Sequence, residues 1–254
     1  MNLPLHLPLH LPLLLPDWTA PRGVRAACST RSSGVSAPPY DSLNLGDHVG
    51  DGEANVAANR DLFARAIQAQ PVFMHQVHGV GVVRLDARTP HGIEADACFT
   101  TERGVACTIM VADCLPVLLT DARGETIAAA HCGWRSLSGG VIEAVCAKLA
   151  TEGAMAWLGP CIGPRAFEVG PEVKAVFEAD DAAAARHFKP HREGKWLADL
   201  AALARMRLQR CGVNLICGND GTDAWCTVGN PARFFSHRRD RGLSGRMAAC
   251  IWRT

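Results

Sequence analysis

The segment VACTIMVADCLPVLLTDARGETIAAAHCGWR, residues 105–135, decides the fold class of this chain. It holds three short apolar runs, VACTIMV (105–111), LPVLLT (115–120) and TIAAAH (126–131), which polar residues and glycine separate. Runs of this length that are rich in Val, Ile and Thr and end at turn-forming residues are typical of buried β-strands. The segment therefore predicts three consecutive strands.

The strand pattern extends upstream, and helical patterns flank it. The runs PVFMHQV (71–77), GVVRL (81–85) and ADACFT (95–100) predict further strands. Apolar residues at helical spacing predict helices over 54–69, 136–150 and 171–187, and another over 195–211 that includes Trp196. Because no Pro- or Ser-rich linker lies between residues 70 and 254, we expect a single α+β domain over residues 17–254.

The first sixteen residues, MNLPLHLPLHLPLLLP, have a composition unlike the rest of the chain. Proline stands at every fourth position, which forbids a continuous helix, and no Lys or Arg precedes Arg22 to form the basic start of an export signal. We expect residues 1–16 to be a poorly ordered low-complexity extension. No run of about 18 apolar residues occurs elsewhere, so no membrane span is predicted.

Charge and cysteine content limit the partners and the compartment. The 254 residues carry 26 Lys and Arg against 25 Asp and Glu, so attraction of the whole protein to nucleic acid or to a membrane is not expected, and the predicted partner is a small molecule. Eleven cysteines, an odd number without any CxxC pair, indicate reduced thiols in the cytoplasm rather than disulfides.

Three segments place reactive side chains where a predicted strand ends: FMHQVHG (73–79), ADCLP (112–116) and HCGWR (131–135). Side chains at such loop-bordered ends can project into a pocket. Two imidazoles and one thiolate bind Zn²⁺ tightly and leave the fourth position of a tetrahedral site open. Spacing alone leaves the choice of ligands open, because His75 and Cys132 compete for the same roles and Cys114 could be a buried core residue.

Two features concentrate positive charge. Arg135 precedes an expected helix start, where its guanidinium and free backbone N–H groups could bind an anion; an exposed arginine at a helix end is the alternative. For the C-terminal basic cluster we expect a solvated face or a second anion contact rather than a nucleic-acid site. That cluster comprises Arg233, His237, Arg238, Arg239, Arg241 and Arg246. Cys161, between two Gly-Pro pairs, is a thiol without an assigned role.

The phosphate-loop, GxGxxG, HExxH, GxSxG and cytidine-deaminase patterns are all absent from the sequence, which argues against those common architectures. Six ordered motifs instead resemble the YfiH/laccase-domain family, whose members were formerly called polyphenol oxidases and are now regarded as purine nucleoside phosphorylases. They are SLNLGDHVGD (42–51), HQVHG (75–79), ADCLPV (112–117), HCGWR (131–135), GPCIGPRAFEVG (159–170) and FFSHRRDRGLSGR (234–246). The resemblance implies a layered α/β/β/α sandwich with mixed sheets, related to a bacterial toxin that deamidates its target.

The resemblance also implies the residues of the site. It implies a mononuclear zinc whose ligands, and expected catalytic residues, are His78, Cys114 and His131. The expected substrate-binding residues are Asn44, Gln76 and Arg135. The family commonly has Ala in place of Cys132 and Tyr in place of His237, and neither departure removes a ligand.

The function that the resemblance implies is zinc-dependent phosphorolysis of purine nucleosides, together with adenosine deamination and methylthioadenosine phosphorolysis. An alternative is a Cys/His amide hydrolase with Cys114 as nucleophile and His131 as base. Copper-dependent phenol oxidation is a further alternative, but a multicopper site needs more histidines than the eight that remain outside the N-terminal repeat can readily supply. The last alternative is a binding protein without catalytic activity.

Overall fold

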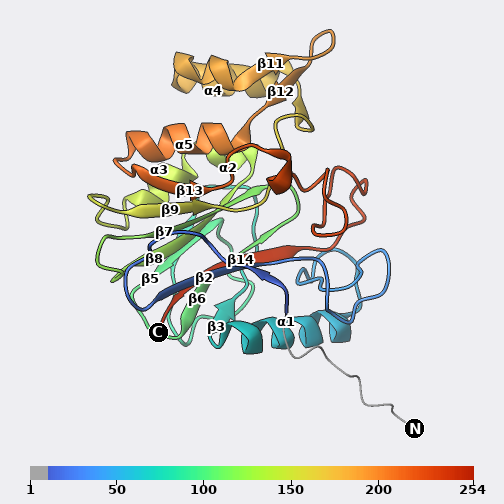
Figure 1. Ribbon diagram of the computed structural model, residues 1–254, viewed down its shortest axis with the longest axis vertical. Coiled ribbons are helices and arrows are strands. Elements are labelled where there is room, and N and C mark those ends of the chain that lie inside the picture. Colours follow the sequence, from blue (N-terminus) through green and yellow to red (C-terminus); the bar gives the residue numbers. More distant parts are fainter. Residues whose placement is uncertain (1–10) are drawn as a thin grey trace.

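The computed structural model describes residues 11–254 and contains two large mixed sheets that pack face to face (Figure 1). The first sheet has the strand order β1-β2-β14-β6-β3. Its strands are β1 (Leu13–Leu14), β2 (Val24–Ser29), β14 (Met247–Arg253), β6 (Val105–Val111) and β3 (Gln70–Val72). β3 runs parallel to β6, and the other neighbouring strands are antiparallel. The last strand of the chain, β14, lies at the centre of this sheet between β2 and β6.

The second large sheet has the order β13-β9-β7-β8-β5-β4 and supplies most of the site. Its strands are β13 (Leu215–Gly218), β9 (Met155–Leu158), β7 (Leu115–Thr120), β8 (Ile127–Cys132), β5 (Ala97–Thr100) and β4 (Val82–Arg84). A small antiparallel sheet completes the fold with β10 (Glu168–Val169), β12 (Trp196–Ala198) and β11 (Phe188–Pro190).

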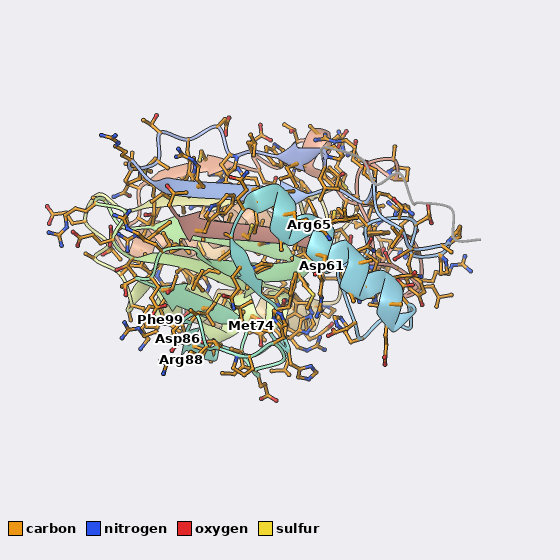
Figure 2. All side chains as sticks on the ribbon, turned by 90° about the horizontal axis from the view of Figure 1, so that it is seen from below. Asp61, Arg65, Met74, Asp86, Arg88 and Phe99 are labelled. Carbon is orange, nitrogen blue, oxygen red and sulfur yellow. The ribbon has the colours of Figure 1, made fainter. Side chains whose placement is uncertain are left out.

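Helices cover the outer face of each large sheet. Helix α1 (Glu53–Ile67) packs Phe63 and Ile67 against the first sheet, and Figure 2 shows it lying across that sheet with Asp61 and Arg65 on its solvent side. Helices α3 (Val141–Cys146) and α5 (Leu200–Arg210) cover the second sheet, with α2 (Trp134–Gly139) beside them and α4 (Pro171–Asp180) beyond (Figure 1). Two 3₁₀ helices, η1 (Ala182–His187) and η2 (Asp223–Trp225), complete the helical elements. The expected α/β/β/α layering is confirmed.

The predicted strands in 105–131 form because both faces of each sheet are covered. Along β7, Leu118 faces the core between the two sheets, while Val117 and Leu119 face the helices. Side chains alternate between the faces of a strand, so a strand buried on both faces is apolar throughout. The same alternation directs His131 of β8 toward the first sheet and Cys132 toward the helices.

The helix predictions were right in place and wrong in extent. The helix expected over 136–150 is two short helices, because Gly140 adopts a left-handed conformation with φ of 99° between them. The helix expected over 171–187 ends at Asp180 and a 3₁₀ turn follows. The prediction that Trp196 lies in a helix was wrong, because this residue lies in β12. Helix α5 begins at Leu200, after the N-cap Asp199, whose carboxylate accepts a hydrogen bond from the Ala202 N–H.

The extension expected over residues 1–16 falls largely outside the described residues. Of its described part, Leu13 and Leu14 pair antiparallel with Ser29 and Cys28 of β2. Pairing with the sheet thus begins ahead of residue 17, while the division of the chain into extension and domain stays a prediction. In the part of the chain that the structure describes, the helices are too short or too polar to cross a bilayer.

Candidate metal centre

Three side chains from separate segments converge at one end of the sandwich. His78 follows β3 in a turn where it adopts φ of 60°, Cys114 directly precedes β7, and His131 lies near the end of β8. Their ligand atoms all lie within 4.8 Å of one another, and no other such group of His, Cys, Asp or Glu occurs in residues 11–254. The three residues that the sequence singled out therefore form one cluster.

The spacing of this cluster fits a metal ion. The Sγ of Cys114 lies 3.7 Å from Nε2 of His78. With Zn–S and Zn–N bonds of about 2.3 and 2.0–2.1 Å, a tetrahedral zinc would separate these two atoms by about 3.6 Å. Three protein ligands leave a fourth position open toward solvent, as in catalytic sites. The donor set alone also suits copper, so the geometry supports a metal without selecting the element.

Asp96, directly before β5, organises two of the three candidate ligands. Its buried carboxylate accepts the Nδ1–H of His131 at 2.8 Å. It also accepts the backbone N–H groups of Val77, His78 and Gly79, at 3.1, 2.9 and 2.6 Å. The first bond leaves Nε2 of His131 free to bind a metal, and the other three hold the turn that carries His78.

The cluster stabilises a thiolate beside an imidazolium. Burial opposes ionisation of Cys114, but the charge of His131 and hydrogen bonds from both histidines lower the pKa of its thiol to about 6. Burial also opposes the charged form of His131, but the Cys114 thiolate and Asp96 raise its pKa to about 9. The pair thus carries one shared proton near neutral pH, which a bound metal would displace.

Gly133 leaves room for the cluster. A Cβ atom at this position would lie 2.8 Å from Cδ2 of His78 and 3.0 Å from Sγ of Cys114. The backbone of Gly133 has φ of −66° and ψ of 160°, which any residue adopts. Glycine is therefore required here by the close approach of the two ligands and not by backbone conformation.

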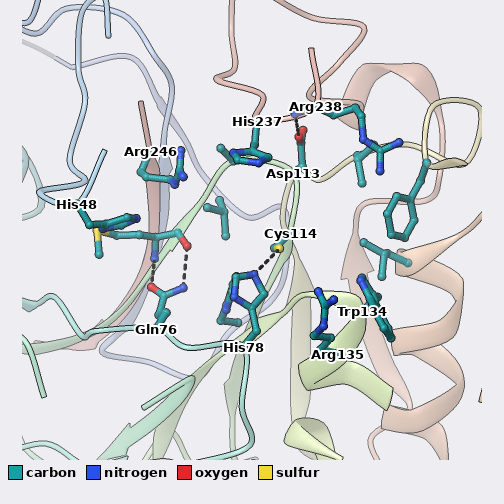
Figure 3. Close-up of a pocket in the computed structure, with 17 residues that line it drawn as sticks. His48, Gln76, His78, Asp113, Cys114, Trp134, Arg135, His237, Arg238 and Arg246 are labelled. Atoms are coloured by element: carbon teal, nitrogen blue, oxygen red, sulfur yellow. Dashed lines mark hydrogen bonds between the residues drawn. The ribbon is translucent and has the colours of Figure 1, made fainter. Parts of the chain in front are cut away.

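The cluster lies in a cavity of about 360 Å³, which Figure 3 shows with its lining side chains. This volume falls within the roughly 300–1,000 Å³ typical of small-molecule sites. Trp134 and Phe167 contribute aromatic walls, and Ile162 and Leu200 add aliphatic ones. His48, His237, Arg135, Arg238 and Arg246 supply the basic groups of the lining. The cavity thus combines an apolar wall with positive charge around the candidate ligands.

The structure brings two of the three expected substrate-binding residues to this cavity. Arg135 lines it, exposed, with its guanidinium carbon 4.4 Å from the ring centroid of Trp134. Gln76 lines it too, but its amide donates to the Met110 carbonyl at 2.9 Å and accepts the Met110 N–H at 2.8 Å. Asn44 is buried away from the lining and binds Gly46, Asp51 and the backbone N–H of Arg246.

The competing residues lie elsewhere. Cys132 is fully buried among the apolar side chains under α3, and His75 is exposed and outside the ligand cluster. Cys161 is buried, with its sulfur 3.2 Å from the Asn219 amide nitrogen. His237, the residue that departs from the family pattern, is exposed and forms part of the cavity rim.

Sequence reasoning missed several residues of the site. A carboxylate inside the apolar run ADACFT was the one signal for Asp96, since a buried charge in a strand needs partners. Asp113, with φ of 88°, holds the loop above the cavity by accepting the Thr227 hydroxyl and the Arg238 N–H. Nothing in the local pattern distinguishes the Arg246 that lines the cavity from its basic neighbours.

Comparison with known proteins agrees with this geometry. Residues 25–254 match the family described as multi-copper polyphenol oxidoreductase laccase. The chain belongs to the YfiH/laccase-domain family. Within that family it is 48% identical over 241 residues to the purine nucleoside phosphorylase YfiH of Escherichia coli, covering 93% of this chain and 97% of that protein. It is 41% identical over 243 residues to a purine nucleoside phosphorylase of Haemophilus influenzae, with the same two coverages.

Solved structures of the family have the same fold. Neisseria meningitidis protein NMB0706 superposes with a TM-score of 0.90 at 43% identity, covering 95% of this chain and 98% of that one. YlmD of Geobacillus stearothermophilus superposes with a TM-score of 0.85 at 27% identity, covering 95% and 99%. The family resemblance and fold expected from the six motifs are confirmed.

Proposed function

We propose that this chain is a zinc-dependent purine nucleoside phosphorylase that also deaminates adenosine and cleaves methylthioadenosine. The observation that carries the proposal is the convergence of His78, Cys114 and His131 in a cavity with aromatic walls. The names of the YfiH relatives support the phosphorylase activity. Zinc is proposed over copper because the cluster has one thiolate and two imidazoles with an open position, a set that suits a Lewis-acid site.

The protein's contribution would be to hold the metal and to orient the nucleoside. A bound zinc would supply Lewis acidity at the centre of the cavity. Asp96 fixes the ring of His131 with Nε2 toward the cluster, and the Gly133 backbone permits Cys114 and His78 to approach. The rings of Trp134 and Phe167 offer flat apolar surfaces that a purine base can stack on.

The proposed reaction transfers the sugar from base to phosphate. An oxygen of hydrogen phosphate bonds to C1′ of the ribose, the bond from C1′ to the base nitrogen breaks, and the base leaves with that electron pair and takes up the proton that the phosphate releases. Arg135 is proposed to contact the nucleoside at the exposed, aromatic side of the cavity, where its guanidinium lies over the Trp134 ring. Gln76 and Asn44 are proposed to act by shaping the cavity, because their amides are bonded to the backbone of Met110 and Arg246.

A cysteine amide hydrolase is the second candidate, and one observation favours it. Asp96, His131 and Cys114 stand in the order acid, base and nucleophile, with the Nδ1–H of His131 on Asp96. That arrangement has no need of His78, yet Asp96 also binds the backbone of the turn that brings His78 within 3.7 Å of the sulfur. The second imidazole favours the metal centre.

A reducing, cytoplasmic location is proposed with this function. All eleven cysteines are free thiols, including the proposed ligand Cys114. A thiolate ligand and unpaired buried cysteines are compatible with a reducing compartment.

The test is product analysis with defined metal and phosphate. The purified protein is stripped with a chelator, reloaded with one equivalent of zinc, and incubated with adenosine, inosine, guanosine or methylthioadenosine with and without phosphate. We expect free base and a sugar phosphate only when zinc and phosphate are both present, with inosine formed from adenosine. Base release that is independent of phosphate would contradict phosphorolysis, and a protein that turns over none of these nucleosides would contradict the proposed function.

A further inference from the structure

The C-terminal basic cluster divides into residues that hold loops and residues that line the cavity. Arg239 is fully engaged, with bonds to the carboxylate of Asp240 and to the carbonyls of Thr227 and Phe234. Arg233 stacks over the Phe234 ring at 4.9 Å. Three members line the cavity instead: His237, Arg238 and Arg246. These three residues are therefore the candidates for the second anion contact that the sequence predicts.

Arg238 and Arg246 both line the cavity without an ion-pair partner among the described residues, but Arg238 is exposed, whereas Arg246 is half-buried. The Nη1 of Arg246 donates to the carbonyls of Ser244 and Gly245, at 2.8 and 3.1 Å. Within residues 11–254, no carboxylate lies at ion-pair distance from it, and neither Nε nor Nη2 has a hydrogen-bond partner. Neither nitrogen is fully buried, and the Arg246 side chain lines the cavity.

The position of Arg246 makes its charge costly in the absence of an anion. Burial lowers the pKa of its guanidinium, while the charges of Cys114 and Asp113 favour the protonated form from a distance. A cation that is removed from water loses hydration, and the two carbonyls on Nη1 replace only part of it. Its backbone N–H is fixed by the Asn44 side chain, and its stem packs on Gly46, so the group is held in place. Arg246 is preorganised for an anion.

His48 provides a second donor at the same end of the cavity. It lines the cavity with a side chain that is 48% exposed. Arg246 lines the cavity on the same side of Cys114, and burial and the charge of Arg246 lower the pKa of His48. The adjacent Asp47 pairs with Arg60 at 3.1 Å rather than with Arg246, and its Oδ1 lies 3.5 Å from Nδ1 of His48. Nε2 is therefore the nitrogen of His48 that remains to donate to a ligand.

The cavity therefore has two unlike ends. Figure 3 shows Arg246 and His48 on one side of Cys114, and Trp134 and Arg135 on the other. Arg135 is exposed and stacked on Trp134, where water and salt screen its charge. The stronger anion site is expected at the half-buried Arg246, because charge-assisted hydrogen bonds gain strength away from water.

We propose that Arg246 and His48 form a phosphate-binding subsite at the end of the cavity opposite Trp134. The ligand class is the phosphoryl dianion, whose several acceptor oxygens suit the two free guanidinium donors and an imidazole N–H. Resting on the proposed phosphorolysis, this subsite holds the inorganic phosphate that attacks the ribose, and the base occupies the aromatic end. A nucleotide that carries a 5′-phosphate presents the same chemistry and is the alternative source.

The test is calorimetric titration of zinc-loaded protein with inorganic phosphate at about pH 8, where phosphate is a dianion. The variants are Arg246→Met, Arg246→Lys, His48→Leu and Arg135→Ala, and the control is Arg65→Gln on the solvent side of α1. Loss of hydrogen bonds to a charged group predicts about a tenfold to hundredfold weaker Kd for Arg246→Met, with a smaller loss for Arg246→Lys. His48→Leu should weaken binding by about threefold, since it removes one exposed donor. Arg65→Gln should match the unmodified protein.

The outcomes separate the subsite from the proposed reaction. Unchanged phosphate affinity in Arg246→Met, or a larger loss in Arg135→Ala, would overturn the subsite. If Arg246→Met does not fold by its melting curve, Arg246→Lys and His48→Leu decide, and wild-type affinity in both would overturn the subsite. Parallel titrations with AMP and adenosine identify the source: Arg246-dependent binding of AMP alone would refute the assignment to inorganic phosphate. If phosphate binds through Arg246 but the protein releases no base from any nucleoside, the subsite is supported and the proposed phosphorylase activity is refuted.

Discussion

Replacing Asp96 by Asn should damage the metal centre although Asp96 is not one of the candidate ligands. Each carboxylate oxygen of Asp96 accepts two hydrogen bonds: Oδ1 from His78 N–H and His131 Nδ1–H, Oδ2 from the N–H groups of Val77 and Gly79. An amide NH₂ can occupy either position, and in both orientations it faces two donors. At least two hydrogen bonds are therefore lost in a side chain with no solvent exposure.

The magnitude follows from that count. Hydrogen bonds to a charged group contribute about 1.5–3 kcal/mol each, so the free energy of unfolding of the metal-free protein should fall by about 3 kcal/mol or more. Loss of a carboxylate that orients a histidine ligand typically weakens metal binding by about 10–100-fold, and we expect Asp96→Asn to fall in this range. The His131 ring loses the partner that leaves Nε2 free for the metal.

The assay is competition for zinc with a chromophoric chelator, together with urea unfolding of the metal-free protein. Asp61→Asn, an exposed change on α1, is the matched control and should leave both measurements unchanged. The reasoning is refuted if Asp96→Asn is destabilised but binds zinc as tightly as the unmodified protein. That result would make Asp96 a support for the turn and nothing more.

Two further substitutions and one measurement on the unmodified protein test the ligands and their surroundings. Gly133→Ala should lower zinc affinity at least about tenfold in the chelator assay, because its Cβ would lie 2.8 Å from the His78 ring; wild-type affinity would contradict the close packing. Cys132→Ala should keep full zinc by elemental analysis and lower stability by about 1 kcal/mol, since the thiol lies in the core; loss of zinc would mean that the wrong cysteine was chosen. Zinc binding should release about one proton near pH 7.5, measured by calorimetry in buffers of different ionisation enthalpy, because the pKa of Cys114 is about 6 and that of His131 about 9. The number should rise above one below the lower value and approach zero above the higher one, and a pH-independent number would contradict the shared proton.

The central strands of the two large sheets could be predicted from sequence, because a strand covered on both faces is apolar along its whole length. This holds for β6, β7 and β8, whose residues are all buried. The helical predictions failed where a single residue changes the backbone, as at Gly140, or where a strand precedes a helix, as at Trp196. Apolar spacing reports burial and does not report such a change of direction.

The candidate metal ligands could be predicted from motifs, but the residues that hold those ligands in place could not. Asp96 binds groups 17 to 35 residues away in sequence, and no local pattern encodes partners at that distance. Arg246 and His48 lie nearly two hundred residues apart and share one end of the cavity. Among several arginines of similar local sequence, only the arrangement of the sheets decides which ones line the cavity.

The central claim is that the cluster of His78, Cys114 and His131 holds zinc and that this zinc is needed for phosphorolysis. The most direct test measures zinc content and phosphate-dependent base release on one preparation of Cys114→Ser, with Cys132→Ala prepared in parallel. We predict that Cys114→Ser loses both together, because serine is a much weaker zinc ligand than a thiolate, and that Cys132→Ala retains both. Full zinc content in an inactive Cys114→Ser protein would contradict this account and identify Cys114 as a nucleophile.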